Sequence, residues 1–77
     1  MKPVCIRFCK VWASYESDAA RVAELIKREL GVEPELIEGD REEFSVWVGD
    51  QIVAKKGWVI IPSDKKVLSA VKQALAR

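Results

Sequence analysis

The residue of this chain best suited to chemistry is Cys9, which is followed directly by Lys10. Residues 3–9 alternate between apolar and other side chains, which predicts a β-strand that ends at this thiol and lets the sulfur emerge at the rim of a sheet. A thiol that lies near a helix N-terminus and beside a lysine has its thiolate form favoured and becomes a nucleophile. The competing interpretation is that Cys9 is a small buried residue, because cysteine is among the most buried residue types.

The remaining composition excludes most other kinds of chemistry. The chain has no histidine, which removes histidine general bases, Ser-His-Asp triads and histidine metal ligands. Cys5 is the second of two cysteines, and along a strand its Cα atom lies about 13 Å from that of Cys9. A disulfide joins Cα atoms within about 7 Å. We therefore expect no metal site and no disulfide between these two residues.

Three sequence patterns predict the secondary structure of the first half of the chain. Alternation predicts a strand over residues 3–9, whose buried side carries Val4, Ile6 and Phe8. Apolar residues at helical spacing then predict a helix that begins at an N-cap at Ser17, or nearer Ser14, and ends at Gly31. Residues 32–38 contain Pro34, which predicts a short strand at a sheet edge.

The sequence of the second half of the chain predicts a β-hairpin followed by a final helix. Residues 43–48 alternate, and Gly49-Asp50 is a two-residue turn signal that leads into a strand over residues 51–54. Residues 58–61 are apolar and end at a proline, which favours a buried loop or a fifth short strand. Ser63 is the predicted N-cap of the last helix, whose apolar stripe includes Val67 and Val71.

This order of elements predicts one α/β domain over residues 1–77, of the α+β two-layer sandwich type. The first strand, helix and second strand form a right-handed parallel crossover, and the hairpin extends the sheet in antiparallel fashion. We expect the elements to follow one another along the chain in the order β-α-β-β-β-α. The four strands should form one mixed sheet, with both helices on one of its faces.

Charge and hydropathy narrow the classes of partner. Lysines and arginines number 13 and acidic residues 12, so the net charge of +1 argues against a nucleic-acid partner. No apolar run approaches the roughly 20 residues of a membrane span, and no secretory signal is recognisable, so we expect a cytoplasmic protein without a membrane partner. The acidic residues crowd positions 33–43 and basic residues dominate the last third, which predicts a solvated surface or, alternatively, a basic face for an acidic protein or a nucleic acid.

Several segments in this order resemble the selenoprotein W-like (Rdx) family. The resemblance covers nearly the whole chain and is carried by residues 8–12, 38–39, 43–48, 51–57 and 68–75. It implies a thioredoxin-like fold and a thiol-redox role, with glutathione or protein thiols as partners and no other cofactor. Cys9 matches the first position of the family's Cys-x-x-Cys or Cys-x-x-selenocysteine site, whereas Trp12 stands at its second position.

The replacement at Trp12 leaves two functional hypotheses. A dithiol cycle needs a second thiol to resolve a mixed disulfide, so Cys9 retains monothiol chemistry, with Lys10 as a stabiliser of the thiolate. The alternative is a redox-inactive protein-interaction module that uses the loop from Cys9 to Trp12. In that case Trp12 and Trp58 are anchors for a partner, although each tryptophan also fits a role as a cap on the core. The sequence sets neither the substrate nor the oligomeric state.

Overall fold

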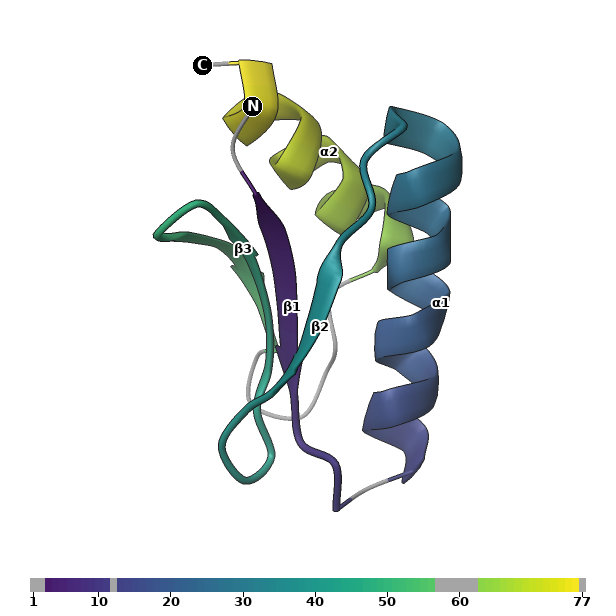
Figure 1. Ribbon diagram of the computed structural model, residues 1–77, viewed down its shortest axis with the longest axis vertical. Coiled ribbons are helices and arrows are strands. Elements are labelled where there is room, and N and C mark those ends of the chain that lie inside the picture. Colours follow the sequence, from purple (N-terminus) through teal and green to yellow (C-terminus); the bar gives the residue numbers. More distant parts are fainter. Residues whose placement is uncertain (1–2, 12, 57–62, 77) are drawn as a thin grey trace.

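A computed structural model describes residues 3–11, 13–56 and 63–76 of the chain. Figure 1 shows a sheet and two helices, which follow one another along the chain in the predicted order. The elements are β1 (Val4–Phe8), α1 (Ala13–Leu30), β2 (Glu35–Glu38), β3 (Phe44–Val48), β4 (Gln51–Lys55) and α2 (Asp64–Ala76). The loop or strand expected at 58–61 lies outside the described residues.

The four strands form one mixed sheet in the order β2-β1-β3-β4. β1 pairs in parallel with β2, and β3 pairs in antiparallel fashion with both β1 and β4. The prediction of a short second strand at the edge, parallel to the first, is confirmed. Because β1 and β3 are the inner strands, the carboxyl end of β1 is flanked on both sides by other chain segments.

Both helices cover the same face of this sheet. The alternate residues of β1 and β3 that are almost fully buried form one cluster with residues from α1 and α2: Val4, Ile6, Phe8, Phe44, Val46, Val48, Ala19, Val22, Ile26, Val67, Val71 and Ala74. Their cross-strand pairing, such as Ile6 opposite Val46, places them on a single side. The predicted two-layer arrangement is confirmed, and the side chains between them point to the opposite face, which no described helix covers (Figure 1).

Helix α1 begins five residues earlier than an N-cap at Ser17 would set it. It starts at Ala13, so the longer loop expected before it is wrong and the alternative start near Ser14 is closer. Tyr15 explains the extension, because it lies one turn before Ala19 on the same helix face and packs against the core. Gly31 ends the helix with φ of 70° and donates its N–H to the Lys27 carbonyl at 3.0 Å, as predicted.

Helix α2 begins where its predicted cap lies. Ser63 Oγ accepts the backbone N–H of Lys66 at 3.3 Å, which satisfies one of the open donors of the first turn. The Arg21 side chain of α1 donates hydrogen bonds to Asp18 and to Asp64, the first residue of α2. This contact ties the start of α2 to the middle of α1.

The hairpin of β3 and β4 contains an irregularity that the sequence pattern does not reveal. Trp47 pairs with Ile52 and Val46 pairs with Ala54, so Val53 is an extra residue in β4. The bulge lets Val53 and Ala54 both pack against the core, while Ile52 stays on the helix-free face opposite Trp47. Among the described residues, neither helix is long and apolar enough to cross a membrane.

Candidate functional site

Cys9 is the first residue after β1, and its side chain is buried. Its backbone N–H donates to the Glu43 carbonyl at 2.9 Å, which continues the pairing of β1 with β3 by one residue. The residue is 2% exposed, so the expectation of a sulfur that emerges at the sheet rim is wrong. β1 ends at Phe8, so the alternation of its side chains does not set the surroundings of Cys9.

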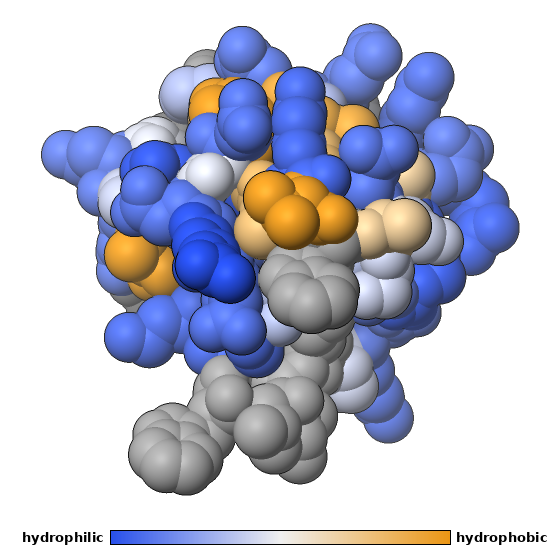
Figure 2. Space-filling model, turned by 90° about the horizontal axis from the view of Figure 1, so that it is seen from below, coloured by the Kyte–Doolittle hydropathy of each residue, from blue (hydrophilic) through white to orange (hydrophobic). Residues whose placement is uncertain are grey.

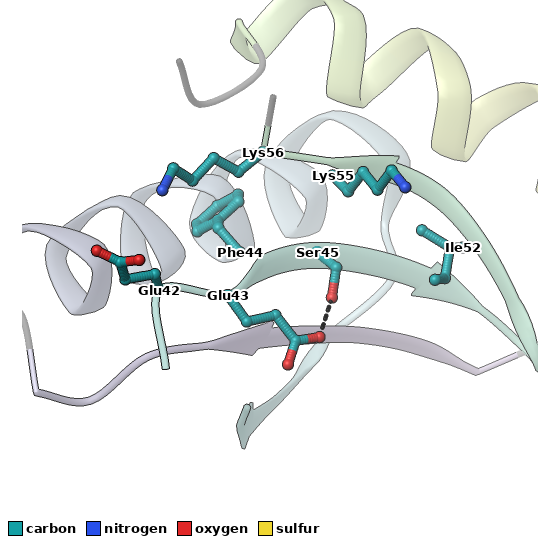
Figure 3. A pocket seen from close by; sticks show the side chains of 7 residues that line it. All are labelled: Glu42, Glu43, Phe44, Ser45, Ile52, Lys55 and Lys56. Carbon is teal, nitrogen blue, oxygen red and sulfur yellow. Dashed lines mark hydrogen bonds between the residues drawn. The ribbon is translucent and has the colours of Figure 1, made fainter. Parts of the chain in front are cut away.

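Lys56 supplies a positive charge close to this thiol. Its ammonium group lies 5.2 Å from the centre of the Tyr15 ring. A hydrogen bond with the Tyr15 hydroxyl raises the pKa of Lys56 above its ordinary value, and the nearby charges of Glu42 and Cys9 raise it further. Lys56 is therefore a cation at neutral pH. Figure 3 shows its charged end and that of Glu42 on the same side of Phe44.

The backbone around the start of β3 brings Cys9 and Lys56 together. Glu43 accepts a hydrogen bond from the Cys9 N–H on one side, and Phe44 accepts one from the Lys56 N–H at 2.7 Å on the other. β1 and β4 thus hold the two residues on either side of one short segment. Lys56 was not predicted as a neighbour of Cys9. A count of the hairpin register from the Gly49-Asp50 turn would not have found it, because that count misses the bulge at Val53.

Of the other predicted site residues around the loop, the structure describes only Lys10. The side chain of Lys10 is exposed at the start of the connection from β1 to α1, while Trp12 and Trp58 lie outside the described residues. Cys5 is half-buried on the helix-free face, where it pairs across the strands with Trp47. Cys5 and Cys9 therefore occupy different surroundings.

Glu43 organises the turn that precedes β3. Its carboxylate accepts the backbone N–H of Asp40 at 2.7 Å and the hydroxyl of Ser45 at 2.8 Å, the latter drawn in Figure 3, and lies 3.7 Å from Arg7 Nε. Partial burial raises the pKa of Glu43, but the two hydrogen bonds and the Arg7 charge together outweigh this, and its pKa lies below the ordinary value. Gly39 lies against the same carboxylate, because a Cβ atom there would stand 2.6 Å from Glu43 Oε1.

The loop after Cys9 presents an apolar side chain to solvent. Val11 is 77% exposed. Figure 2 views the molecule from the end at which β1 stops, and it shows apolar side chains in the middle of a mostly hydrophilic face. An exposed valine in a short connection contributes nothing to the core, so its position is available for contact with another molecule.

The chain matches no family model, and no curated protein matches it. Within residues 3–11, 13–56 and 63–76, no group of three or more cysteine and acidic side chains is arranged to hold a metal ion. Around the end of β1, the Lys56 ammonium group interacts with the Tyr15 hydroxyl, the Glu42 carboxylate and the Cys9 thiol. Such a set can stabilise a thiolate.

Proposed function

We propose that this chain is a selenoprotein W-like protein with a thioredoxin-like fold that performs monothiol chemistry at Cys9. The observation that carries the proposal is the backbone pairing at the start of β3, where the Cys9 N–H bonds to Glu43 and the Lys56 N–H bonds to the next residue, Phe44. Lys56 is held mainly by Tyr15, and its charge also interacts with Cys9. A cation beside a thiol favours the nucleophilic thiolate. The position of Cys9 directly after the first strand of a parallel crossover supports the same assignment.

The reaction is an exchange of disulfide bonds with glutathione as the outside thiol. The Cys9 thiolate attacks the glutathione sulfur of a protein–glutathione mixed disulfide, and that S–S bond breaks as the new one forms. The protein substrate leaves as a thiolate and takes a proton from water. A glutathione thiolate then attacks the Cys9 adduct, which releases glutathione disulfide and returns the Cys9 thiolate. In the net reaction one free glutathione and the glutathionyl group of the mixed disulfide become glutathione disulfide, while the substrate sulfur is reduced to a thiol, and no second cysteine is needed.

Burial makes this chemistry conditional on a local opening. Because Cys9 is 2% exposed, a disulfide reaches its sulfur only when the chain around the end of β1 moves aside. Local openings have free energies that range from near zero up to that of global unfolding. Cys9 should therefore react more slowly than an exposed thiolate, and its rate should rise in denaturant concentrations too low to unfold the protein.

Mass spectrometry of the native Cys5→Ser variant with glutathione disulfide tests the proposal. We expect one glutathionyl group on Cys9 and a rate roughly tenfold lower at neutral pH when Lys56→Met removes the cation. Lys27→Met is the matched control, because Lys27 is exposed in the last turn of α1, at the other end of that helix from the connection to Cys9. The proposal fails if Cys9 is modified only after global unfolding, or if both lysine variants react like their parent.

A second candidate function is a redox-inactive interaction module that uses the loop from Cys9 to Trp12. The exposed Val11 and the buried Cys9 favour it, since the loop then presents an apolar contact and keeps its thiol covered. In affinity capture with the folded protein as bait, Cys9→Ser should retain a bound partner that Val11→Asp and Trp12→Ala both lose. Loss of the partner with Cys9→Ser and its retention with the other two variants would exclude this function.

A further inference from the structure

Tyr15 joins two parts of the chain that meet near the end of β1. It lies in the first turn of α1, after the connection that leaves Cys9, and it is half-buried because its side chain packs against the core. The ammonium group of Lys56 lies 5.2 Å from the centre of the Tyr15 ring, and the Tyr15 hydroxyl oxygen accepts a hydrogen bond from the same lysine. Because Lys56 follows β4, this contact bridges the first helix and the last strand.

Lys56 does not hold its charge in place by itself. A lysine ammonium group ends a flexible stem, and its donors turn toward water as readily as toward protein groups. The hydrogen bond from the Lys56 N–H to the Phe44 carbonyl, at 2.7 Å, fixes only the start of the side chain. Within the described parts of the chain, Lys56 forms no ion pair with a carboxylate. The contact that fixes its charged end is therefore the one with Tyr15.

The titratable groups that face the Lys56 charge come from three parts of the fold. They are Tyr15 on α1, Glu42 in the turn before β3, and Cys9 after β1. Glu42 is exposed on the same side of Phe44 and attracts Lys56 through its charge alone (Figure 3). Tyr15 differs from it because an apolar ring packed on the core carries the polar tip that bonds to the lysine. Of these groups, Tyr15 is the one that offers a fixed point.

We propose that Tyr15 is a positioning residue for Cys9, because its hydroxyl and ring hold the Lys56 ammonium group where it stabilises the thiolate. This role rests on the proposed function, since Tyr15 acts on the same thiol through Lys56. A cation favours a thiolate more strongly the nearer it stays, because their attraction falls with distance and is screened by solvent. Without the hydroxyl, Lys56 stays charged but turns into solvent more often, so fewer Cys9 thiols are ionised at neutral pH.

Titration of Cys9 in the Cys5→Ser variant tests this role. The Cβ chemical shift of Cys9 in nuclear magnetic resonance spectra reports the ionisation of the thiol in the folded protein, whether or not a disulfide reaches it. Tyr15→Phe keeps the ring and removes only the hydroxyl, so we expect a thiolate fraction about threefold smaller at neutral pH. Tyr15→Leu removes the ring as well, and its loss should approach the roughly tenfold loss expected for Lys56→Met.

Two further variants show whether the effect belongs to Tyr15 and passes through the lysine. Ser17→Ala removes a hydroxyl from an exposed position of the same helix and should leave the titration unchanged. With methionine already at position 56, Tyr15→Phe should have no additional effect, because the group that it positions is gone. Circular dichroism checks that each variant is folded.

Three results would contradict this role. A shift of full size for Tyr15→Phe in the Lys56→Met background overturns it, because the hydroxyl would then act without the lysine. An unchanged titration in Tyr15→Phe, beside a shifted one in Lys56→Met, overturns the role of Tyr15 and leaves the proposed function standing. An unchanged titration in Lys56→Met overturns both.

Discussion

Phe44→Ala is expected to leave most of the protein unfolded at room temperature. Phe44 is the largest of the fully buried side chains, at 1% exposure, and pairs with Phe8 between the sheet and the helices. Truncating a buried phenylalanine costs about 3–5 kcal/mol through lost burial and the cavity left behind. A core in a chain of this size supplies a net stability of about the same amount. Urea unfolding followed by circular dichroism measures the difference.

Two other substitutions show whether the cavity is the cause. Phe44→Leu keeps most of the volume and should cost less than half as much as alanine. Ile52→Ala removes apolar atoms from a residue that is 45% exposed, so it should change the free energy of unfolding by less than about 1 kcal/mol. An alanine variant at position 44 with the urea midpoint of the unmodified chain would show that this ring does not hold the two layers together.

The two layers of this fold could be predicted because apolar residues recur at regular spacing along the chain. Val4, Ile6 and Phe8 recur every second residue, and the stripe of α1 recurs every three to four, so each pattern identifies one buried side. The first turn of α1 could not be fixed in this way. Ser17 has the character of a cap, but the contact of Tyr15 with the core extends the helix before it.

The surroundings of Cys9 depend on contacts that the sequence does not state. Alternation sets the direction of side chains only within a strand, and Cys9 lies one residue beyond β1. Its proximity to Lys56 depends on the register of two strand pairs, one of which contains the bulge at Val53. A count that ignores this bulge shifts Lys56 by one position and places it on the wrong face.

Glu43 differs from the other acidic residues of its segment, and the pattern gave no reason to separate it from them. The carboxylates between positions 33 and 43 were expected to be solvated, whereas the Glu43 side chain is only 21% exposed. It joins the turn, β1 and β3 through Asp40, Arg7 and Ser45. Ser45, which lies between Arg7 and Lys55 in the register of the strands, is buried at 3%.

Glu43→Ala is therefore expected to lower the free energy of unfolding by about 2–3 kcal/mol at pH 7, since hydrogen bonds to a charged group are worth about 1.5–3 kcal/mol. Part of the loss arises at Arg7. Its Nε is buried and, among the described residues, has no hydrogen-bond partner, so the Glu43 charge is its compensation. Urea unfolding at pH 7 measures the change, and Gly39→Ala should reproduce part of it by displacing the Glu43 carboxylate.

The pH dependence of stability separates the charge of Glu43 from its size. The pKa of Glu43 is lower in the folded protein than its ordinary value of 4.5, so its ionised form stabilises the fold. That contribution is fully present above pH 4.5 and is lost as the pH falls through the folded-state pKa. Glu43→Gln should consequently be less stable than the unmodified chain at pH 7, and the difference should shrink as the solution is acidified. Glu42→Gln is the matched control. Glu42 is exposed, so this substitution should not change how the free energy of unfolding falls as the solution is acidified. Parallel stability curves for Glu43→Gln and the unmodified chain down to pH 3 would mean that the Glu43 carboxylate holds the turn by shape alone.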